Sequence, residues 1–365
     1  MQGHKFHNAR PANETCVTAH ALARPSWRNT LRRAFVSLRA FAGNACMALA
    51  CAAEITIANA AWADGTVSYV MENDSLAHTD RYYTHGGRLG WISGEQASRA
   101  CADRLMQALP FIECRSDARW AFSLTQAIYT PRWLRRTNPD PADRPYAGWL
   151  HGTFGAIARK DAMLDQLYFS IGVVGPASQA DEMQHFIHDA YGYPRANGWE
   201  HQLGNELTLQ SFYSRTHRIF RIESASGYGF DIAPHYGGAL GNVYIYGNVG
   251  GLMRLGKNLP DDFGPSRVLP GGAGSDYSKG TGRLGWYAFA GVDGRAIARN
   301  LFLDGNTFRE SRSVERENLV GDIQIGAVID WRSVRFAYTH VWRTREFVGQ
   351  FASQAFGSFS LEYRY

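Results

Sequence analysis

Beyond residue 63 the sequence lacks any apolar run long enough for a transmembrane helix, which excludes a helical membrane protein for this part of the chain. It also lacks excess charge there. Residues 1–63 hold seven basic and two acidic residues, and subtracting these from the totals of 38 and 33 leaves 31 of each sign. A neutral body excludes a polybasic surface, so no nucleic-acid partner is expected.

The first 63 residues have the organisation of a secretion signal. Four arginines between positions 28 and 39 precede the small apolar run 40–53, and Ala61-Trp62-Ala63 fits an A-x-A cleavage pattern. The alternative, an N-terminal membrane anchor, would need a longer apolar run. The sequence therefore predicts a signal peptide and leader over residues 1–63 and one domain over residues 64–365.

Cysteine is scarce after the leader, where only Cys101 and Cys114 of the five cysteines remain. In an oxidising compartment such a closely spaced pair is expected to form a disulfide. Two thiols without a nearby histidine cluster are a poor ligand set, which argues against a thiolate metal site.

The body of the chain alternates in polarity with period two. In the last strand apolar residues at odd positions alternate with polar residues at even positions: Phe359, Leu361, Tyr363 and Tyr365 against Ser358, Ser360, Glu362 and Arg364. Period two is typical of a β-strand with two different faces. Abundant Tyr, Trp, Phe and Gly suit a membrane barrel, because alternate residues face lipid and aromatic residues gather at both interfaces.

These patterns predict an all-β fold, a transmembrane antiparallel β-barrel of about twelve strands in the bacterial outer membrane. An open sheet in lipid would leave unpaired edge groups, so the strand ending at Tyr365 should pair with the first strand. The alternative is a soluble β-sandwich, which also alternates. A closed barrel needs no partner subunit, so a monomer is expected, surrounded by outer-membrane lipids and inserted by the barrel assembly machinery.

A pass along the chain predicts twelve strands and one short helix at the extracellular end. The helix is expected over residues 179–191, which lack strand alternation, and a mobile loop over the Gly-, Pro- and Asp-rich stretch 261–280. The strands are expected near residues 65–73, 84–93, 119–130, 146–159, 164–175, 203–214, 228–238, 242–255, 284–294, 319–331, 333–343 and 355–365.

Polar residues from separate segments should gather at one mouth of this barrel. Gln184 and His188 are four residues apart on the predicted helix and share one face. Asn73 and Asp74 end the first strand, and Thr84 opens the second. If the first strand runs outward, all five positions come to the extracellular end, which an inert pore would not require.

At these residues the sequence resembles the outer-membrane lipid A 3'-O-deacylases. The resemblance covers about half of the chain after the leader, in order, and the C-terminal strands match only in kind. Its motifs are Glu72-Asn73-Asp74, Tyr83-Thr84-His85-Gly86, Thr125-Gln126-Ala127-Ile128-Tyr129-Thr130-Pro131, Asp143-Arg144-Pro145-Tyr146-Ala147-Gly148-Trp149, Val174-Gly175-Pro176, Gln184-x-x-x-His188, Gly198-Trp199 and Gln202-Leu203-x-Asn205-Glu206.

The resemblance implies a twelve-stranded barrel with a calcium-dependent esterase site that faces the outer leaflet. It implies that His188 is the catalytic histidine and that four further residues belong to the site: Gln184, Asn73, Asp74 and Thr84. The family places a lysine after the third strand, whereas this chain offers Arg135 or Arg136, of which Arg136 is the better positional match. Arginine keeps the charge without the compact ammonium group.

The residues themselves support ester hydrolysis by water. The chain has no G-x-S-x-G motif, which excludes a serine hydrolase with that nucleophile elbow. Histidine exchanges protons near neutral pH, so His188 can take a proton from water. A hard cation at Asp74, calcium or another divalent ion, could bind the acyl carbonyl. Arg136 would pair with a phosphate of the lipid A or lipopolysaccharide substrate.

Two other functions remain open from the sequence. An outer-membrane phospholipase would act on glycerophospholipids through a serine nucleophile. A non-enzymatic barrel, a porin or a scaffold, would use the helix at 179–191 as a plug.

Overall fold

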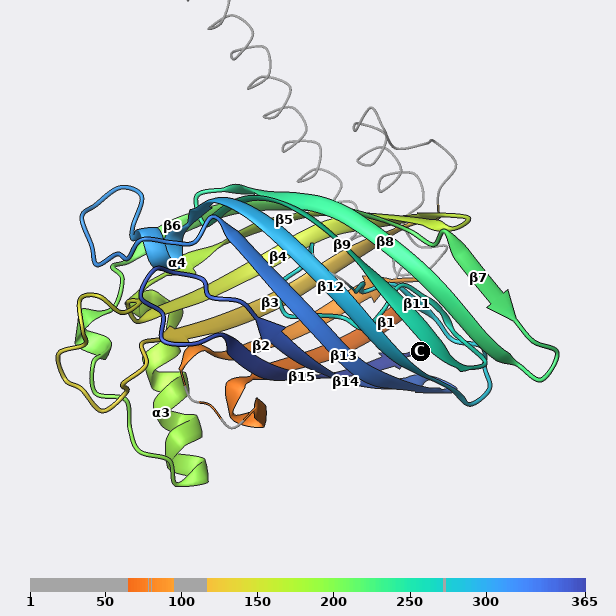
Figure 1. The fold of residues 1–365 in the computed structure, drawn as a ribbon, viewed down its shortest axis with the longest axis horizontal. Helices are drawn as coiled ribbons and strands as arrows, with labels where there is room; N and C mark the ends of the chain where they lie inside the picture. Colours follow the sequence, from red (N-terminus) through yellow and green to blue (C-terminus); the bar gives the residue numbers. More distant parts are fainter. Residues whose placement is uncertain (1–64, 78, 80, 95–116, 272–273) are drawn as a thin grey trace, which may run out of the picture. The chain divides into compact units, whose positions relative to one another are not determined.

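The computed structural model describes residues 65–365 apart from residues 78, 80, 95–116 and 272–273. Twelve antiparallel strands form a closed barrel in which β15 pairs with β1 and β6 pairs with β8 (Figure 1). The barrel strands are β1 (Gly65–Asn73), β2 (Tyr82–Ser93), β3 (Asp117–Thr130), β4 (Ala147–Lys160), β5 (Met163–Val174), β6 (Glu206–His217), β8 (Tyr228–Gly241), β9 (Tyr244–Lys257), β12 (Gly285–Asn300), β13 (Leu319–Trp331), β14 (Val334–Arg343) and β15 (Gln354–Arg364).

The predicted strands are confirmed in number and place, and the first and tenth agree at both ends. The predicted helix is α3 (Ala180–Tyr191). The leader at residues 1–63 and the pair Cys101 and Cys114 lie outside the described residues. No helix in the described part of the chain is long and apolar enough to cross a membrane.

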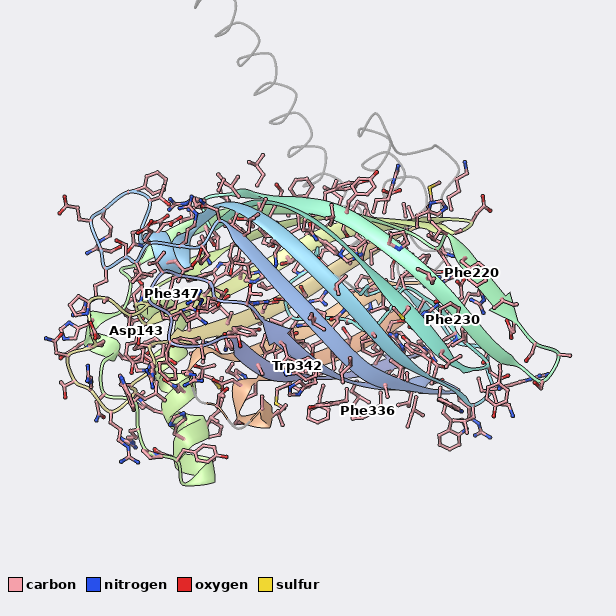
Figure 2. All side chains as sticks on the ribbon, in the orientation of Figure 1. Asp143, Phe220, Phe230, Phe336, Trp342 and Phe347 are labelled. Atoms are coloured by element: carbon pink, nitrogen blue, oxygen red, sulfur yellow. The ribbon has the colours of Figure 1, made fainter. Side chains whose placement is uncertain are left out.

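The strands alternate between a polar lumen and an apolar outer face. On β15, Ser358, Ser360 and Glu362 are buried inside, whereas Leu361 and Tyr363 are exposed. On β14, Phe336 and Trp342 are on the outside of the wall (Figure 2). The outward rows of apolar side chains form the surface that lipid covers.

The connections 131–146, 175–205 and 301–318 lie at the end of the barrel where β1, β3 and β5 stop, which is here called the outer end. At the other end the connections 161–162 and 332–333 are two-residue turns, and the long connection 258–284 folds into the lumen. The short helices at the outer end are η1 (Asp74–Ala77), η2 (Pro176–Ser178), η3 (Trp199–His201) and α4 (Leu301–Asp304). Both Gly65 and Tyr365 lie at the opposite, inner end, where each backbone N–H bonds to the other's carbonyl oxygen. Bacterial barrels carry long loops outside and short turns inside, which sets this orientation.

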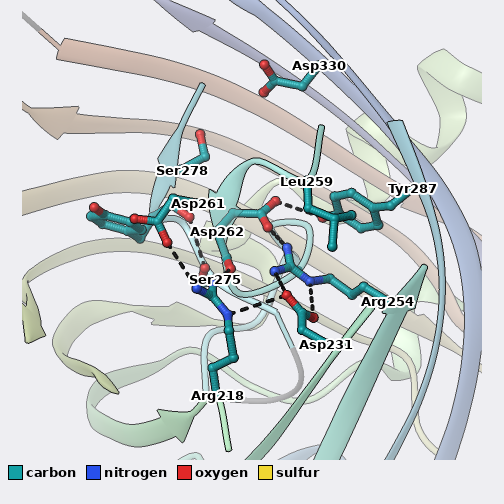
Figure 3. A network of polar contacts seen from close by, with 12 residues as sticks. Arg218, Asp231, Arg254, Leu259, Asp261, Asp262, Ser275, Ser278, Tyr287 and Asp330 are labelled. Atoms are coloured by element: carbon teal, nitrogen blue, oxygen red, sulfur yellow. Dashed lines mark hydrogen bonds and ion pairs between the residues drawn. The ribbon is translucent and has the colours of Figure 1, made fainter. Parts of the chain in front are cut away.

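The stretch predicted as a mobile loop is folded inside the barrel instead. It contains β10 (Asp261–Asp262) and β11 (Ser278–Lys279), and its carboxylates meet arginines of the wall. Asp262 pairs with Arg254 and Arg335, and Figure 3 shows it in a buried network beside Asp231. The turn-forming composition was correctly recognised, but those acidic residues are buried ion-pair partners rather than solvated ones.

Aromatic side chains fill the outer half of the lumen. The rings of Tyr129 and Phe302 stack with centroids 4.2 Å apart, and the Tyr129 and Tyr244 hydroxyls are 3.0 Å apart. A cavity of about 70 Å³ remains beside them. The filled lumen leaves the outside of the wall and the outer loops as the surfaces where a lipid could bind.

Candidate active site

The strand β3 fixes which side of the wall carries the candidate residues. Because Tyr129 points into the lumen toward Tyr244, the even-numbered residues of the same strand point outward. These outward positions include Gln126, Ile128 and Thr130. The outer end of β3 therefore presents polar side chains on the face that elsewhere meets lipid.

The helix α3 begins against this outward face. The Gln126 amide donates to the Ser178 carbonyl at 2.7 Å, just before the helix. On β4, Gly148 also faces outward, and a Cβ atom built there would lie 2.2 Å from the Ala180 Cβ and the Ser178 Oγ. A glycine is therefore needed at position 148 for α3 to approach the wall this closely.

Gln184 is buried on α3 and held in one orientation. The Trp199 indole N–H donates to Gln184 Oε1 at 2.7 Å. The amide nitrogen of Gln184 is also buried and has no hydrogen-bond partner among the described residues. A buried unpaired donor costs about 1–3 kcal/mol, and an acceptor supplied by a ligand would recover it.

His188 lies one turn further along the same face. Its Nδ1 is 2.6 Å from the Pro194 carbonyl oxygen, which can only accept, so Nδ1 carries the proton. The Nε2 atom then holds the lone pair and has no hydrogen-bond partner within the described part of the chain. A histidine in this tautomer can act as a base through Nε2.

The loop after α3 is tied to the helix by an exposed ion pair. Asp189 accepts from Arg195 Nε at 2.9 Å, and this hydrogen bond lowers the pKa of the Asp189 carboxyl. In the neighbouring loop 131–146, burial raises the pKa of Asp143, although the Arg132 and Arg144 amides donate to it.

Asn73 and Asp74 shape the turn between β1 and β2. Asn73 Oδ1 accepts from the Ser75 amide at 2.7 Å, and Asn73 Nδ2 is 3.4 Å from His85 Nδ1. Asp74 Oδ2 accepts from the Arg81 amide at 2.6 Å. Asn73 lies at an outward position of β1, because its neighbour Glu72 points inward.

Thr84 connects this turn to the wall beneath α3. It lies at a register shift between β2 and β3, and its hydroxyl is 2.6 Å from the Thr130 hydroxyl. Thr130 and Ile128 are both outward positions of β3, and Ile128 packs in one cluster with Ala180 and Trp199. The two groups of candidate residues therefore lie on the outer face of adjacent strands β1 to β4.

The prediction that these positions share the extracellular end is confirmed. The prediction that they surround the mouth of the barrel is wrong. Asn73, Thr84, Gln184 and His188 lie on the outside of the wall rather than around the lumen, because each sits at an outward position of its strand or on α3. Asp74 follows Asn73 directly as the first residue of η1. Arg136 does not lie with the other candidate residues. Its exposed guanidinium is 3.9 Å from Asp140, and the described residues give it no contact with the other five.

A cation at this site would have few protein ligands. Asp74 is the one carboxylate among the six candidates, and carboxylate oxygen suits calcium. No group of three or more His, Cys, Asp or Glu residues within the described ranges could hold a metal. Calcium at Asp74 would therefore depend on backbone, water and substrate oxygens for most of its coordination.

Three residues of this site were quoted in the motifs but given no role from the sequence. Trp199 orients Gln184, Thr130 pairs with Thr84, and Gly148 admits α3. Their motif positions were visible, but which of them face outward was not. A hollow of about 960 Å³ lies between β8, β9, β12 and β13 and contains none of the candidate residues.

A closed barrel of twelve antiparallel strands with a filled polar lumen and an apolar outer face defines an outer-membrane β-barrel protein. The chain belongs to the LpxR family of outer-membrane proteins, since the profile described as "Outer membrane protein LpxR" matches residues 44–365.

One solved structure supports the fold. LpxR from Salmonella typhimurium is 20% identical with a TM-score of 0.66, and the match covers 82% of this chain and 99% of that one. The β domain of the Bordetella autotransporter BrkA is 11% identical over 83% of this chain and 97% of that one, with a TM-score of 0.36. None of the curated proteins compared matches this chain.

Proposed function

We propose that this protein hydrolyses the 3'-linked acyl or acyloxyacyl ester of lipid A in the outer leaflet, with His188 as the base. The observation that carries the proposal is the 2.6 Å contact of His188 Nδ1 with the Pro194 carbonyl oxygen, which leaves Nε2 to accept a proton. The position of the helix against the outward face of β3 and β4 supports a lipid as substrate. Membership of the LpxR family supports lipid A as that lipid.

In the proposed reaction, His188 Nε2 takes a proton from water as the water oxygen bonds to the ester carbonyl carbon. The tetrahedral intermediate then breaks its bond to the sugar oxygen, which receives the proton from His188. The products are a free fatty acid and a sugar hydroxyl.

The negative charge that develops on the carbonyl oxygen needs a donor. The buried amide nitrogen of Gln184 is suited to this, because Trp199 already occupies its oxygen. Asn73 and Thr84 would orient the ester, and Arg136 would meet a phosphate of the glucosamine backbone. A divalent cation held at Asp74 would polarise the same carbonyl.

The alternatives receive less support. The lumen segment 258–284 fills the space that a porin would need, and only about 70 Å³ remains beside the aromatic layer. A serine nucleophile for a phospholipase is not favoured at this site, since Ser178 is fully buried and donates to the Gly175 carbonyl at 2.6 Å.

The test is mass spectrometry of lipid A from a Gram-negative host that expresses the protein, His188→Ala or His185→Ala. His185 is the matched control, because it lies on the same helix with Nε2 3.0 Å from the Ala196 carbonyl oxygen. We expect wild type and His185→Ala to remove a 3'-linked acyl chain. His188→Ala should lower the rate by about 10²- to 10⁴-fold.

Folding is checked by heat-modifiable migration of the barrel in gels. Unaltered lipid A in cells with correctly inserted wild-type protein would overturn the proposal. A parallel series in purified outer membranes, with calcium or chelator and with Asp74→Asn, tests the cation. Activity that persists unchanged in chelator would remove calcium from the scheme while leaving the role of His188 intact.

A further inference from the structure

The helix α3 has three chemically distinct faces. Ala180, Gln184 and His188 form the buried face. An acidic and histidine face follows at Asp181, Glu182, His185 and Asp189. The third face is apolar, with the i, i+3, i+4, i+7 spacing of Met183, Phe186, Ile187 and Ala190.

The large apolar side chains on the third face of α3 are exposed. Phe186 is 71% exposed and Met183 40% exposed. Tyr193 in the loop that follows is also exposed. Since large apolar side chains on an exposed helix face indicate an interaction surface, this face needs a partner.

The contacts of α3 with the loop that follows it show which side of the helix faces away from the membrane. His185 contacts the Ala196 carbonyl, and Asp189 pairs with Arg195. The same loop continues to Asn197, whose amide donates to the Leu134 carbonyl at 2.9 Å, beyond the outer end of β3. His185 and Asp189 of the polar face therefore contact the extracellular loop that follows the helix, and the apolar face lies on the other side of the helix.

The depth of α3 follows from the strand register. Its first turn rests on Gly148 of β4. Leu150 is the next outward position of the same strand, toward the inner end of the barrel. Two residues span about 7 Å along a strand, which is about 5 Å of depth at a strand tilt of about 40°. The layer between hydrocarbon and water is about 5–7 Å thick on each side.

We propose that the apolar face of α3 inserts into the outer leaflet at the boundary between headgroups and acyl chains. The base of the helix lies at the depth of that boundary, and in Figure 1 α3 leaves the barrel crosswise to its long axis, as a helix in the membrane plane would. The wall at the same end of the barrel carries exposed apolar side chains on β5 and β6: Ile171, Leu207 and Leu209. Lipid then holds the helix that carries Gln184 and His188 from the side that the loops leave open.

This proposal does not depend on the reaction assigned to the site, so its test does not use activity. The photo-reactive residue p-benzoylphenylalanine would replace Phe186 or Met183, and in a control protein Phe308. Phe308 is 80% exposed in the loop after α4 at the same end of the barrel. Intact outer membranes are irradiated, and adducts are identified by mass spectrometry.

We expect lipid adducts at positions 186 and 183 at several-fold higher yield than at position 308. Equal yields at all three positions, or adducts to protein at position 186, would overturn the proposal. A second measurement places Phe186→Trp in vesicles with brominated lipids at known depths. The tryptophan at position 186 should be quenched most by bromines near the headgroup boundary. Quenching that is equal at all depths would also count against insertion.

Discussion

The indole nitrogen of Trp199 donates to Oε1 of Gln184, and this bond leaves the buried amide nitrogen of Gln184 without a partner among the described residues. Trp199→Phe keeps an aromatic ring against Tyr146 but removes the donor. Loss of one hydrogen bond of about 1 kcal/mol predicts a roughly five- to tenfold fall in kcat for acyl release. Trp133→Phe, at an exposed indole of the neighbouring loop, is the control and should retain full rate.

Gly148→Ala should displace α3 without opening the barrel. The new methyl group would lie 2.2 Å from the Ala180 Cβ, a distance at which one of the two must move. Gly152→Ala is matched to it on the same outward face of β4, and a Cβ there meets nothing within 4 Å. We expect lipid A deacylation to fall at least tenfold in Gly148→Ala alone, with heat-modifiable migration unchanged in both. Equal activity in the two variants would show that the close approach of α3 is unimportant.

Thr84 and Thr130 should behave as one unit. Each valine substitution removes one end of the 2.6 Å hydrogen bond and leaves the other hydroxyl buried and unpaired. We expect Thr84→Val and Thr130→Val to lower stability toward denaturant by about 1 kcal/mol each, and the double variant to lose less than the sum. Thr84→Ser keeps the hydroxyl and serves as the control. Strict additivity would mean that the two hydroxyls do not depend on each other.

The filled lumen predicts a barrel that conducts no ions. Arg335 bonds to Glu362 at 2.8 Å and also pairs with Asp262, and Arg88 pairs with Asp276, so segment 258–284 is tied to the wall at several points. In planar bilayers the wild-type protein should show no stepwise conductance. Replacing residues 264–276 with a short Gly-Ser turn should create openings. Large steady conductance from the wild type would restore the porin alternative.

Acid should loosen the end of α3. The folded pKa of Asp189 is lowered by Arg195, so the stabilisation from this pair is complete above the ordinary aspartate pKa of about 4. It is lost as pH falls through the lowered folded value. Hydrogen exchange in residues 185–197, corrected for intrinsic rates, should therefore rise below pH 4 and stay flat between pH 5 and 8. Asp189→Asn should show the faster exchange throughout; unchanged exchange in this variant would contradict the prediction.

Strand positions could be predicted because alternation is a local property. In β13, Ile323 and Ile325 face lipid while Gln324 faces the lumen, and a wrong register would reverse all of them. The lumen segment could not be recognised, since the partners of Asp262 and Asp276 come from strands far away in the sequence. The sequence also did not predict on which side of the barrel wall the candidate site lies. That side depends on the register shift at Thr84 and on the contact of Gly148 with Ala180, and neither leaves a periodic pattern.

The seam between the first and last strands has a consequence for the timing of activity. The turn that holds Asn73 and Asp74 leans on β15: Thr79 contacts the Ala355 carbonyl, and Gln354 donates to the carbonyls of Arg81 and Tyr83. Until β15 is synthesised and paired with β1, the hydrogen bonds from β15 to this turn are missing. A chain whose β15 is not yet paired with β1 therefore lacks a complete candidate site, and under the proposed function it would not yet hydrolyse the ester bonds of lipids that it meets before insertion.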